Sequence, residues 1–345
     1  RARFKDGKKR LMSSEKIRVG VIGAGGNTTK LHIPGLQAQE GVEIVTVVNR
    51  TAASSQRVAD EFGIPNISPD WQAVIEDPDI DAVCIGTWPY MHAPMTISAL
   101  VEEKHVLCEA RMALNADEGH AMLDAARQSP RCVAQIVPAP HTLAFDQTII
   151  DMIADGYIGE LITLDARIAA GSNFPNPNSP TPWRQDRWVG PMANVFASGQ
   201  AVVNHRVNEA GHRVAMTIPD HVDIMGKMEQ GGQIRFNVST VIGHVPATVD
   251  VCIFGTEGTL RLYMAGSDPM ALFAGKRGDA GLSEVAIDPA KKGGWRVEEE
   301  FINAIRGVED ITHTDLTTAV KYMEWTDAVT MSLRTGQSVT LPLMG

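Results

Sequence analysis

The chain has 345 residues, which is enough for two domains that each bury a hydrophobic core. Its composition, 44% hydrophobic and 21% charged residues, is typical of a soluble globular protein. The net charge of −10 disfavours nucleic acid as a partner, and no apolar run approaches the roughly 18 residues that a membrane span requires.

Residues 1–15 are rich in basic side chains and lack the apolar stretch of a secretion signal, so we expect a flexible leader outside the fold. From residue 16 to 138, apolar runs alternate with helical patterns. This alternation predicts a Rossmann domain, a doubly wound parallel sheet with right-handed crossovers and helices on both faces. Strands are expected at 16–22, 43–48, 82–86, 105–108 and 133–137, and helices at 32–39, 51–62, 71–75, 92–103 and 116–128.

The pattern changes after Pro138, and residues 139–345 predict a second, α+β domain for substrate binding and oligomerisation. Several of its segments alternate apolar and polar residues, as an open, mostly antiparallel sheet with one covered face should. Gly258 is expected to end a hairpin turn with a positive φ. Strands are expected at 160–169, 197–206, 220–229, 233–241, 248–254, 259–263 and 339–341, and helices at 141–154, 295–306 and 316–334.

Cysteine and histidine usage bears on metals and compartment. The four cysteines show neither metal-type nor redox spacing, which favours a reduced, cytoplasmic setting. Histidines on the predicted sheet do not share metal-ligand spacing either. We therefore expect no metal.

The first strand runs into a glycine-rich turn, Gly23-Ala24-Gly25-Gly26-Asn27, and the residues after it can open a helix. Glycine lets the chain turn sharply and lets its backbone approach a pyrophosphate, while amides at the helix start supply hydrogen bonds. The sequence therefore predicts the first turn of a dinucleotide-binding unit, with Gly23, Gly25, Gly26 and Asn27 at the cofactor.

The second strand ends at Asn49, where NAD-selective proteins place an acidic residue about 20 residues past the glycines. Asn49, Arg50 and Thr51 carry no negative charge that would repel a 2′-phosphate, and Arg50 offers a fork-shaped donor. These residues favour NADP over NAD, with NAD possible. The alternative for Arg50 is a solvated residue at a helix start.

Together with these motifs, the chain resembles the glucose–fructose oxidoreductase/inositol dehydrogenase (Gfo/Idh/MocA) family over residues 17–343. The resemblance implies a Rossmann domain and an α/β domain whose broad sheet often forms an oligomer interface, hence a homodimer or homotetramer. It implies hydride exchange between NAD(P) and a secondary alcohol or ketone of a sugar, cyclitol or related hydroxylated ring. The most specific segments are 19–34, 81–92, 104–113, 301–307 and 325–342.

The resemblance also assigns residues past the fourth strand. Thr87, Trp88, Pro89 and His92 would line the nicotinamide side of the cofactor, and Glu109 would lie beside it. For Trp88 the alternative is a hydrophobic plug between domains. For His92 it is a helix-start residue capped by its own backbone.

The fifth strand departs from the family pattern. The family has Glu-Lys-Pro, with the Lys beside the reacting hydroxyl, whereas this chain has Glu109-Ala110-Arg111. No ammonium is therefore available there to stabilise a developing alkoxide. Arg111 cannot be a general base, but it can polarise a carbonyl or anchor a substrate carboxylate, with Glu109 orienting it. A structural ion pair is the alternative for Arg111.

A second departure follows Arg187, where the family has a glycine-rich loop and a helix that carries the catalytic His. Here Trp188 follows at once. Either the element has been lost or the sequence omits a segment. We favour omission, because deleting the helix would expose apolar surface and remove the chemistry together.

Among the residues that remain, His141 at a helix entrance is the best candidate for proton transfer, with a solvated or capping histidine as the alternative. Trp183, Arg184 and Asp186 follow a proline-rich loop and are expected to bind the substrate. A plain connecting loop is the alternative there.

Two other functions stay open. A tightly held NAD can assist elimination or epimerisation without net redox change. The chain can also be a catalytically silent sensor or scaffold that binds NADP(H), which Ala110 and the absent helix favour.

Overall fold

The computed structural model describes residues 16–138, 144–169, 192–207 and 211–343, which divide into two compact units. The first unit draws on Arg1–Ala139 and Trp295–Met323, and the second on Pro140–Gly294 and Glu324–Gly345. Residues 295–323, which the sequence placed in the second domain, therefore pack with the first. Within the described residues, no helix is both long and apolar enough to cross a membrane.

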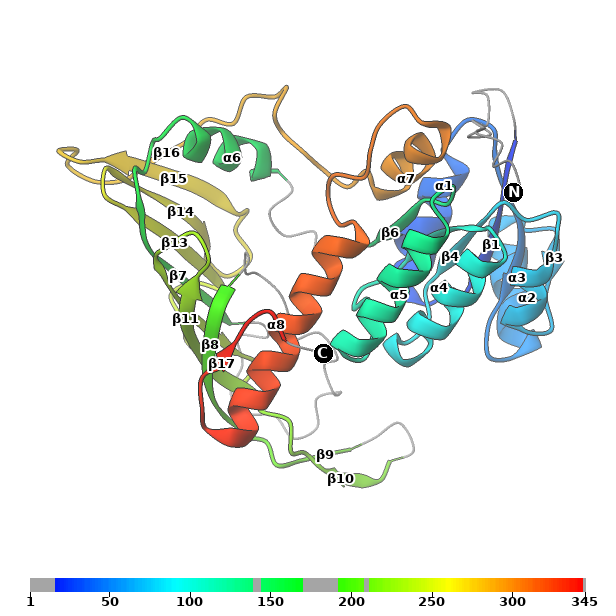
Figure 1. Cartoon of the computed structure of the whole chain (residues 1–345), viewed down its shortest axis with the longest axis horizontal. Coiled ribbons are helices and arrows are strands. Elements are labelled where there is room, and N and C mark those ends of the chain that lie inside the picture. The colour runs from blue at the N-terminus through cyan, green and yellow to red at the C-terminus, as the bar shows by residue number, and fades with distance from the viewer. Residues whose placement is uncertain (1–15, 139–143, 170–191, 208–210, 344–345) are drawn as a thin grey trace, which may run out of the picture. The chain divides into compact units, whose positions relative to one another are not determined.

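The first unit is built on a six-stranded parallel sheet with the order β3-β2-β1-β4-β5-β6 (Figure 1). Its central strands are rich in Val and Ile and are buried on both faces, as parallel strands covered by helices must be. The strand order reverses between β1 and β4, so a ligand crevice is expected at their carboxyl ends. The strands are β1 Ile17–Ile22, β2 Val42–Val48, β3 Asn66–Ile67, β4 Ala82–Ile85, β5 His105–Cys108 and β6 Ala134–Ile136.

Side-chain caps set the start of several helices in this unit. The side-chain oxygens of Thr51, Asp70 and Asn115 each accept a hydrogen bond from the backbone amide three residues on. The first helix begins earlier than predicted, with a π-helical turn over Thr28–His32. The helices are α1 Ile33–Gln37, α2 Ala52–Phe62, α3 Trp71–Glu76, α4 His92–Val101, α5 Ala116–Gln128 and α7 Val297–Arg306, with a 3-10 turn at Pro89–Met91.

The second unit is built on a nine-stranded sheet with the order β16-β15-β14-β13-β7-β12-β11-β8-β17 (Figure 1). Its pairs are antiparallel except for β7 with β12. The predicted fold class, a Rossmann sheet followed by a mostly antiparallel open sheet, is therefore confirmed. The strands are β7 Leu161–Ala169, β8 Met192–Gln200, β11 His221–Met228, β12 Gln233–Ser239, β13 Val249–Gly255, β14 Gly258–Met264, β15 Ala271–Lys276, β16 Ser283–Glu284 and β17 Val339–Thr340, and a separate ribbon joins β9 His205–Val207 to β10 Arg213–Ala215.

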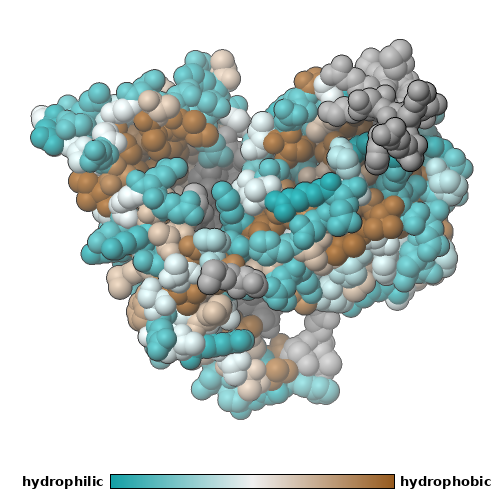
Figure 2. Space-filling view, in the orientation of Figure 1, coloured by the Kyte–Doolittle hydropathy of each residue, from teal (hydrophilic) through white to brown (hydrophobic). Residues whose placement is uncertain are grey.

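Two helices cover one face of this sheet, α6 (Asp146–Ala154) and the second half of α8 (Leu316–Thr335). Trp325 of α8 packs edge-on against Phe236 of β12, with ring centroids 6.2 Å apart. Figure 2 shows hydrophobic residues at the surface in the area of α6 and β14. Ile150 and Ile153 of α6 are both exposed.

Two local predictions in the second unit were wrong. The strand expected at 197–206 is β8, Met192–Gln200, because the amides of Val202 and Val203 donate to the carboxylate of Asp220 at 2.7 and 3.0 Å instead of joining the ladder. Gly258 does not have a positive φ. It is glycine for another reason, since a Cβ there would lie 2.7 Å from the carbonyl oxygen of Tyr157.

Candidate functional site

The glycine-rich turn after β1 is closely packed on one side and open on the other. Gly23 has φ +85°, and a Cβ there would lie 2.8 Å from the amide nitrogen of Thr87. Gly26, in contrast, is exposed, and a Cβ there would have no heavy atom within 4 Å. The turn therefore packs against the loop after β4 while its outer backbone stays accessible, as a phosphate-binding turn requires.

Asn49, at the end of β2, fastens this turn to the start of α2. Its Oδ1 accepts from the amide of Ala24 at 2.7 Å, and its Nδ2 donates to the carbonyl of Ser54 at 3.2 Å. Thr51 accepts from the amide of Ser54 and caps α2. Arg50 lies between them and is exposed. The three residues predicted at the adenosine end thus lie together, and Asn49 has a structural role that the sequence did not predict.

The loop after β4 presents an exposed aromatic residue, because 57% of Trp88 is accessible. Pro89 starts the 3-10 turn that follows, and Thr87 precedes them at the edge of the glycine turn. His92 differs, since it is completely buried. Its Nδ1 lies 2.6 Å from the carbonyl oxygen of Arg111 and its Nε2 2.8 Å from that of Thr87, so the imidazole bridges the loops after β4 and β5.

Hydrogen bonds hold the segment that follows β5 in place. The carboxylate of Glu109, only 6% exposed, accepts from the side chain of Asn27 and, at 3.0 Å, from the amide of Ala110. Beyond the cis peptide bond between Ala110 and Arg111, the amide of Met112 donates to the hydroxyl of Tyr322 at 2.7 Å. With His92 on its carbonyl, Arg111 therefore extends from a fixed backbone.

His32, a residue the sequence analysis did not select, lies at the centre of this network. It is completely buried, with Nε2 3.0 Å from Oε1 of Glu109 and Nδ1 2.5 Å from Oε1 of Glu298. The indole nitrogen of Trp295 also donates to Glu298, at 3.0 Å. Gly35 leaves room for this carboxylate, because a Cβ there would lie 2.7 Å from it. No local motif links His32 to Glu298, since 266 positions separate them.

The electrostatics of the network follow from these contacts. Burial disfavours a charged imidazole, but the hydrogen bonds to Glu109 and Glu298 outweigh it and raise the pKa of His32 to about 9. Burial likewise opposes the charge on Glu109, yet the bond and the charge of His32 lower the pKa of that carboxyl. At neutral pH the site therefore holds an imidazolium between two glutamates.

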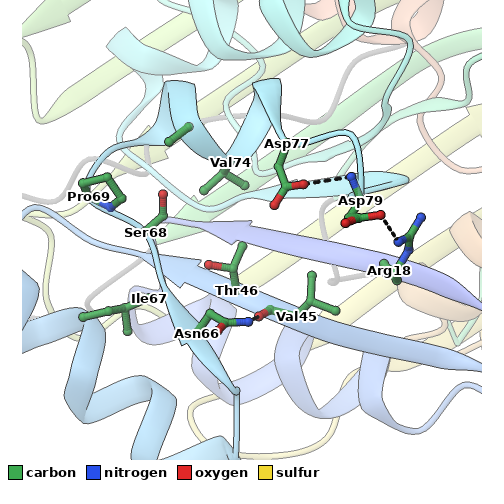
Figure 3. Close-up of a pocket in the computed structure, with 11 residues that line it drawn as sticks. Arg18, Val45, Thr46, Asn66, Ile67, Ser68, Pro69, Val74, Asp77 and Asp79 are labelled. Carbon is green, nitrogen blue, oxygen red and sulfur yellow. Dashed lines mark hydrogen bonds and ion pairs between the residues drawn. The ribbon is translucent and has the colours of Figure 1, made fainter.

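A pocket in the first unit lies away from these residues. It is lined by residues of β1, β2, β3 and α3, and its residues Arg18 and Thr46 lie before the carboxyl ends of β1 and β2 (Figure 3). Figure 3 shows Arg18 directed at Asp79, and their Nη1 and Oδ1 atoms are 2.7 Å apart. Because Arg18 also pairs with Asp81 at 3.3 Å, its charge is already balanced, and we assign no ligand to this pocket.

Four predicted residues, His141, Trp183, Arg184 and Asp186, lie outside the described residues. Among the residues that the structure does describe, no group of three or more His, Cys, Asp or Glu is placed to hold a metal ion.

The known proteins that this chain resembles are oxidoreductases. Residues 17–136 match the GFO_IDH_MocA family, described as an oxidoreductase family with an NAD-binding Rossmann fold. An uncharacterized oxidoreductase, ORF334, of Rhizobium meliloti is 30% identical over 145 residues, which span 42% of this chain and less than half, 43%, of that protein. Levoglucosan dehydrogenase of Pseudarthrobacter phenanthrenivorans is 29% identical over 82% of this chain and 80% of its own length.

Solved structures share the whole fold. Levoglucosan dehydrogenase in complex with NADH and L-sorbose has a TM-score of 0.77 at 20% identity, covering 96% of this chain and 100% of that chain. Its apo form has a TM-score of 0.79 with the same coverage. The first unit is thus an NAD-binding Rossmann domain, and the resemblance noted in the sequence is confirmed. Residues 17–136 thus match the Rossmann domain of the Gfo/Idh/MocA oxidoreductases.

Proposed function

We propose that this protein is an NAD(P)-dependent oxidoreductase that transfers a hydride between nicotinamide and a secondary alcohol or ketone of a sugar, cyclitol or related hydroxylated ring. The observation that carries the proposal is the glycine turn after β1, which is packed inward at Gly23 and open outward at Gly26. The names of relatives support the substrate class, since they include a levoglucosan dehydrogenase and a deoxyglucose-derivative 3-reductase.

The described residues fit a dinucleotide. The exposed backbone at Gly25 and Gly26 can approach a pyrophosphate without a Cβ between them, and the start of the π-helical turn adds peptide amides. Trp88 and Pro89 offer an apolar surface past β4. When bound, the nicotinamide supplies or accepts the hydride.

We favour NADP as the coenzyme. The end of β2 carries the neutral Asn49, and both ends of its carboxamide are engaged by Ala24 and Ser54. No acidic side chain stands at this position to repel a 2′-phosphate, and the exposed guanidinium of Arg50 can bind one.

Arg111 is the residue we assign to the substrate side. Its backbone is fixed by His92 and by the bond from Met112 to Tyr322, so its guanidinium starts from a defined position. Ala110 stands at the position of the family's Lys, and the neighbouring cation, Arg111, stands at the position of the family's Pro. A guanidinium can bind an anion or polarise a carbonyl but does not exchange a proton as a Lys can. Arg111 therefore suits a substrate with a carboxylate or a polarised carbonyl, while Glu109 shapes the charge nearby.

Proton transfer and ring contacts fall to other residues in this proposal. His141 is the candidate acid/base, and Trp183, Arg184 and Asp186 are candidates to contact the hydroxylated ring.

The test is a spectrophotometric assay with the complete protein, both coenzymes, and a panel of sugars, cyclitols and their acid derivatives. We expect turnover, with acid-bearing rings preferred. Arg111→Ala should lower kcat/KM for acid-bearing rings by about 10- to 100-fold, because a charge-assisted bidentate contact is lost, and should affect neutral rings less. Coenzyme binding without turnover on any substrate would contradict catalysis and identify the silent alternative.

A further inference from the structure

The network around His32 connects three parts of the first unit that are far apart in sequence. Glu109 follows the last residue of β5, Glu298 lies in the first turn of α7, and Asn27 closes the glycine turn. The imidazole of His32 stands between the two carboxylates, and Asn27 bonds the same carboxylate as His32 does. A chain of contacts therefore runs from α7 to the backbone that faces the proposed pyrophosphate position.

The chemistry of the contacts requires two protons on the ring. A carboxylate only accepts hydrogen bonds, so both Nδ1 and Nε2 of His32 must donate, one to Glu298 and one to Glu109. A neutral ring would leave one of these buried carboxylates facing a lone pair. With its pKa raised to about 9, His32 carries both ring protons at neutral pH and can donate one to each glutamate.

The other groups around the ring do not replace this charge. Cys84 on β4 lies in the field of both carboxylates, but burial and those charges keep its pKa well above the usual range, so it remains a neutral thiol. Trp295 packs 5.9 Å from the imidazole, centroid to centroid, and donates to Glu298. Among the described residues of this network, His32 is the group that contacts both Glu109 and Glu298 as a cation.

We propose that His32 and Glu298 are positioning residues for dinucleotide binding: they hold the carboxylate of Glu109 in place, which fixes the side chain of Asn27 and hence the glycine turn. The inference rests on the proposed function, because it concerns the turn that would receive the coenzyme. Neither His32 nor Glu298 touches the coenzyme, since both are buried beneath the turn.

A pH dependence follows. The pKa of His32 in the folded protein is raised to about 9, so the ring carries both protons at neutral pH and loses one as the pH rises through about 9. Dinucleotide affinity should therefore be constant near neutrality and should fall above pH 9. The fall would come from deprotonation of His32, which loosens the glycine turn, and not from titration of the coenzyme.

The test measures the affinity of the complete protein for NADPH and for NADH by fluorescence titration between pH 7 and 10.5. Glu298→Gln should weaken binding at pH 7 by about tenfold, equivalent to roughly 1.4 kcal/mol, and shift the fall in affinity to lower pH. Asn27→Ala, which removes the contact between Glu109 and the glycine turn and keeps both contacts of His32 with Glu109 and Glu298, should weaken binding and abolish the fall near pH 9. Glu300→Gln is the matched control, because Glu300 is an equally buried carboxylate on the same helix that bonds His313 and Thr312 instead.

A second measurement does not depend on bound coenzyme. In protein labelled with nitrogen-15 histidine, the ring of His32, assigned by its loss in His32→Gln, should show both nitrogens protonated at pH 7.

The outcomes separate the two proposals. If the wild-type protein binds neither coenzyme, the proposed function fails. If it binds them but Glu298→Gln behaves like Glu300→Gln, if affinity stays flat through pH 10, or if His32 is neutral at pH 7, the positioning role is overturned while the proposed function stands. A stability loss shared by the Glu298 and Glu300 variants without a difference in affinity would show a purely structural role and would also overturn it.

Discussion

Two histidines of the first unit show how partners decide the protonation state of a side chain. His32 faces two carboxylates, and its pKa is raised to about 9 despite burial. For His105 on β5 the attraction of Asp81 favours the charge but is outweighed by burial, which lowers the pKa of the ring to about 4. As a neutral ring, His105 can accept the hydrogen bond that the amide of Val133 donates to its Nδ1 at 2.9 Å. The same residue type is therefore a cation in one place and a neutral acceptor in the other.

Coenzyme choice is tested at the scale of one residue, Arg50. Arg50→Ala should weaken NADPH binding by about 10- to 100-fold and leave NADH nearly unchanged, because only NADPH has the 2′-phosphate that a guanidinium would bind. Arg57→Ala, at an exposed position of α2, the helix that follows Arg50, is the control. Isothermal titration with both coenzymes measures the ratio. An equal change for NADPH and NADH would refute the proposed contact.

Among the elements, α7 carries two inward-facing carboxylates with separate tasks. Glu298 joins the His32 network, while Glu300, fully buried, accepts from Gln135 at 2.7 Å and from the hydroxyl of Thr312 at 2.6 Å. Both lie in the first turn, where the positive end of the helix dipole also favours negative charge. The helix therefore fastens residues 295–323 to the Rossmann sheet through charge-assisted bonds.

The carboxyl group of Glu300 makes the stability of the folded protein depend on pH. Burial opposes the charge of Glu300, but the bonds from His313 and Thr312 prevail and lower its pKa from 4.5 to about 2. A depressed pKa stabilises the folded state above the unfolded value and loses that contribution as the pH falls from 4.5 towards 2. We expect Glu300→Gln to reduce the free energy of unfolding by about 2 kcal/mol at pH 7, with the difference shrinking below pH 4.

Urea unfolding of both proteins across this pH range measures the effect. A difference that stays constant down to pH 2.5 would show that the bonds to Glu300 do not depend on its charge.

For the whole molecule, the second unit leaves one face of its sheet without a covering helix among the described residues. The cross-strand register places Phe196, Met225, Arg235 and Asp165 in one row on this face, opposite the side on which α6 and α8 pack. Met225 is 52% exposed, although it lies in the middle of a strand. We propose that this face forms the interface of a homodimer or homotetramer.

Substitution of Met225 tests whether this face forms the interface. Met225→Asp should shift the protein to a smaller species in light scattering coupled to size-exclusion chromatography, because a charged side chain would replace an apolar one in the buried interface. Val101→Asp, at a more exposed apolar position on α4 of the first unit, should leave the assembly unchanged. A wild-type protein that is monomeric at micromolar concentration would refute the interface.

Features set by local chemistry could be predicted from the sequence. Apolar period and turn residues determine which segments become strands or helices, so the doubly wound sheet and the antiparallel sheet were both anticipated. The glycine turn was predictable because only glycine permits its φ and its close approach to the loop after β4. Short edge strands such as β3 and β16 were missed, because two residues carry no detectable period.

Other features were decided only by the tertiary structure. The pairing of His32 with Glu298, the return of residues 295–323 to the first unit and the bond from Ala24 to Asn49 join positions that no sequence window contains. Gly258 illustrates the same point on a smaller scale, since the constraint comes from Tyr157 and not from the turn itself. The physical reason is common to all of them: the charge and conformation of a buried group depend on which distant atoms reach it, and the chain settles this only when it folds.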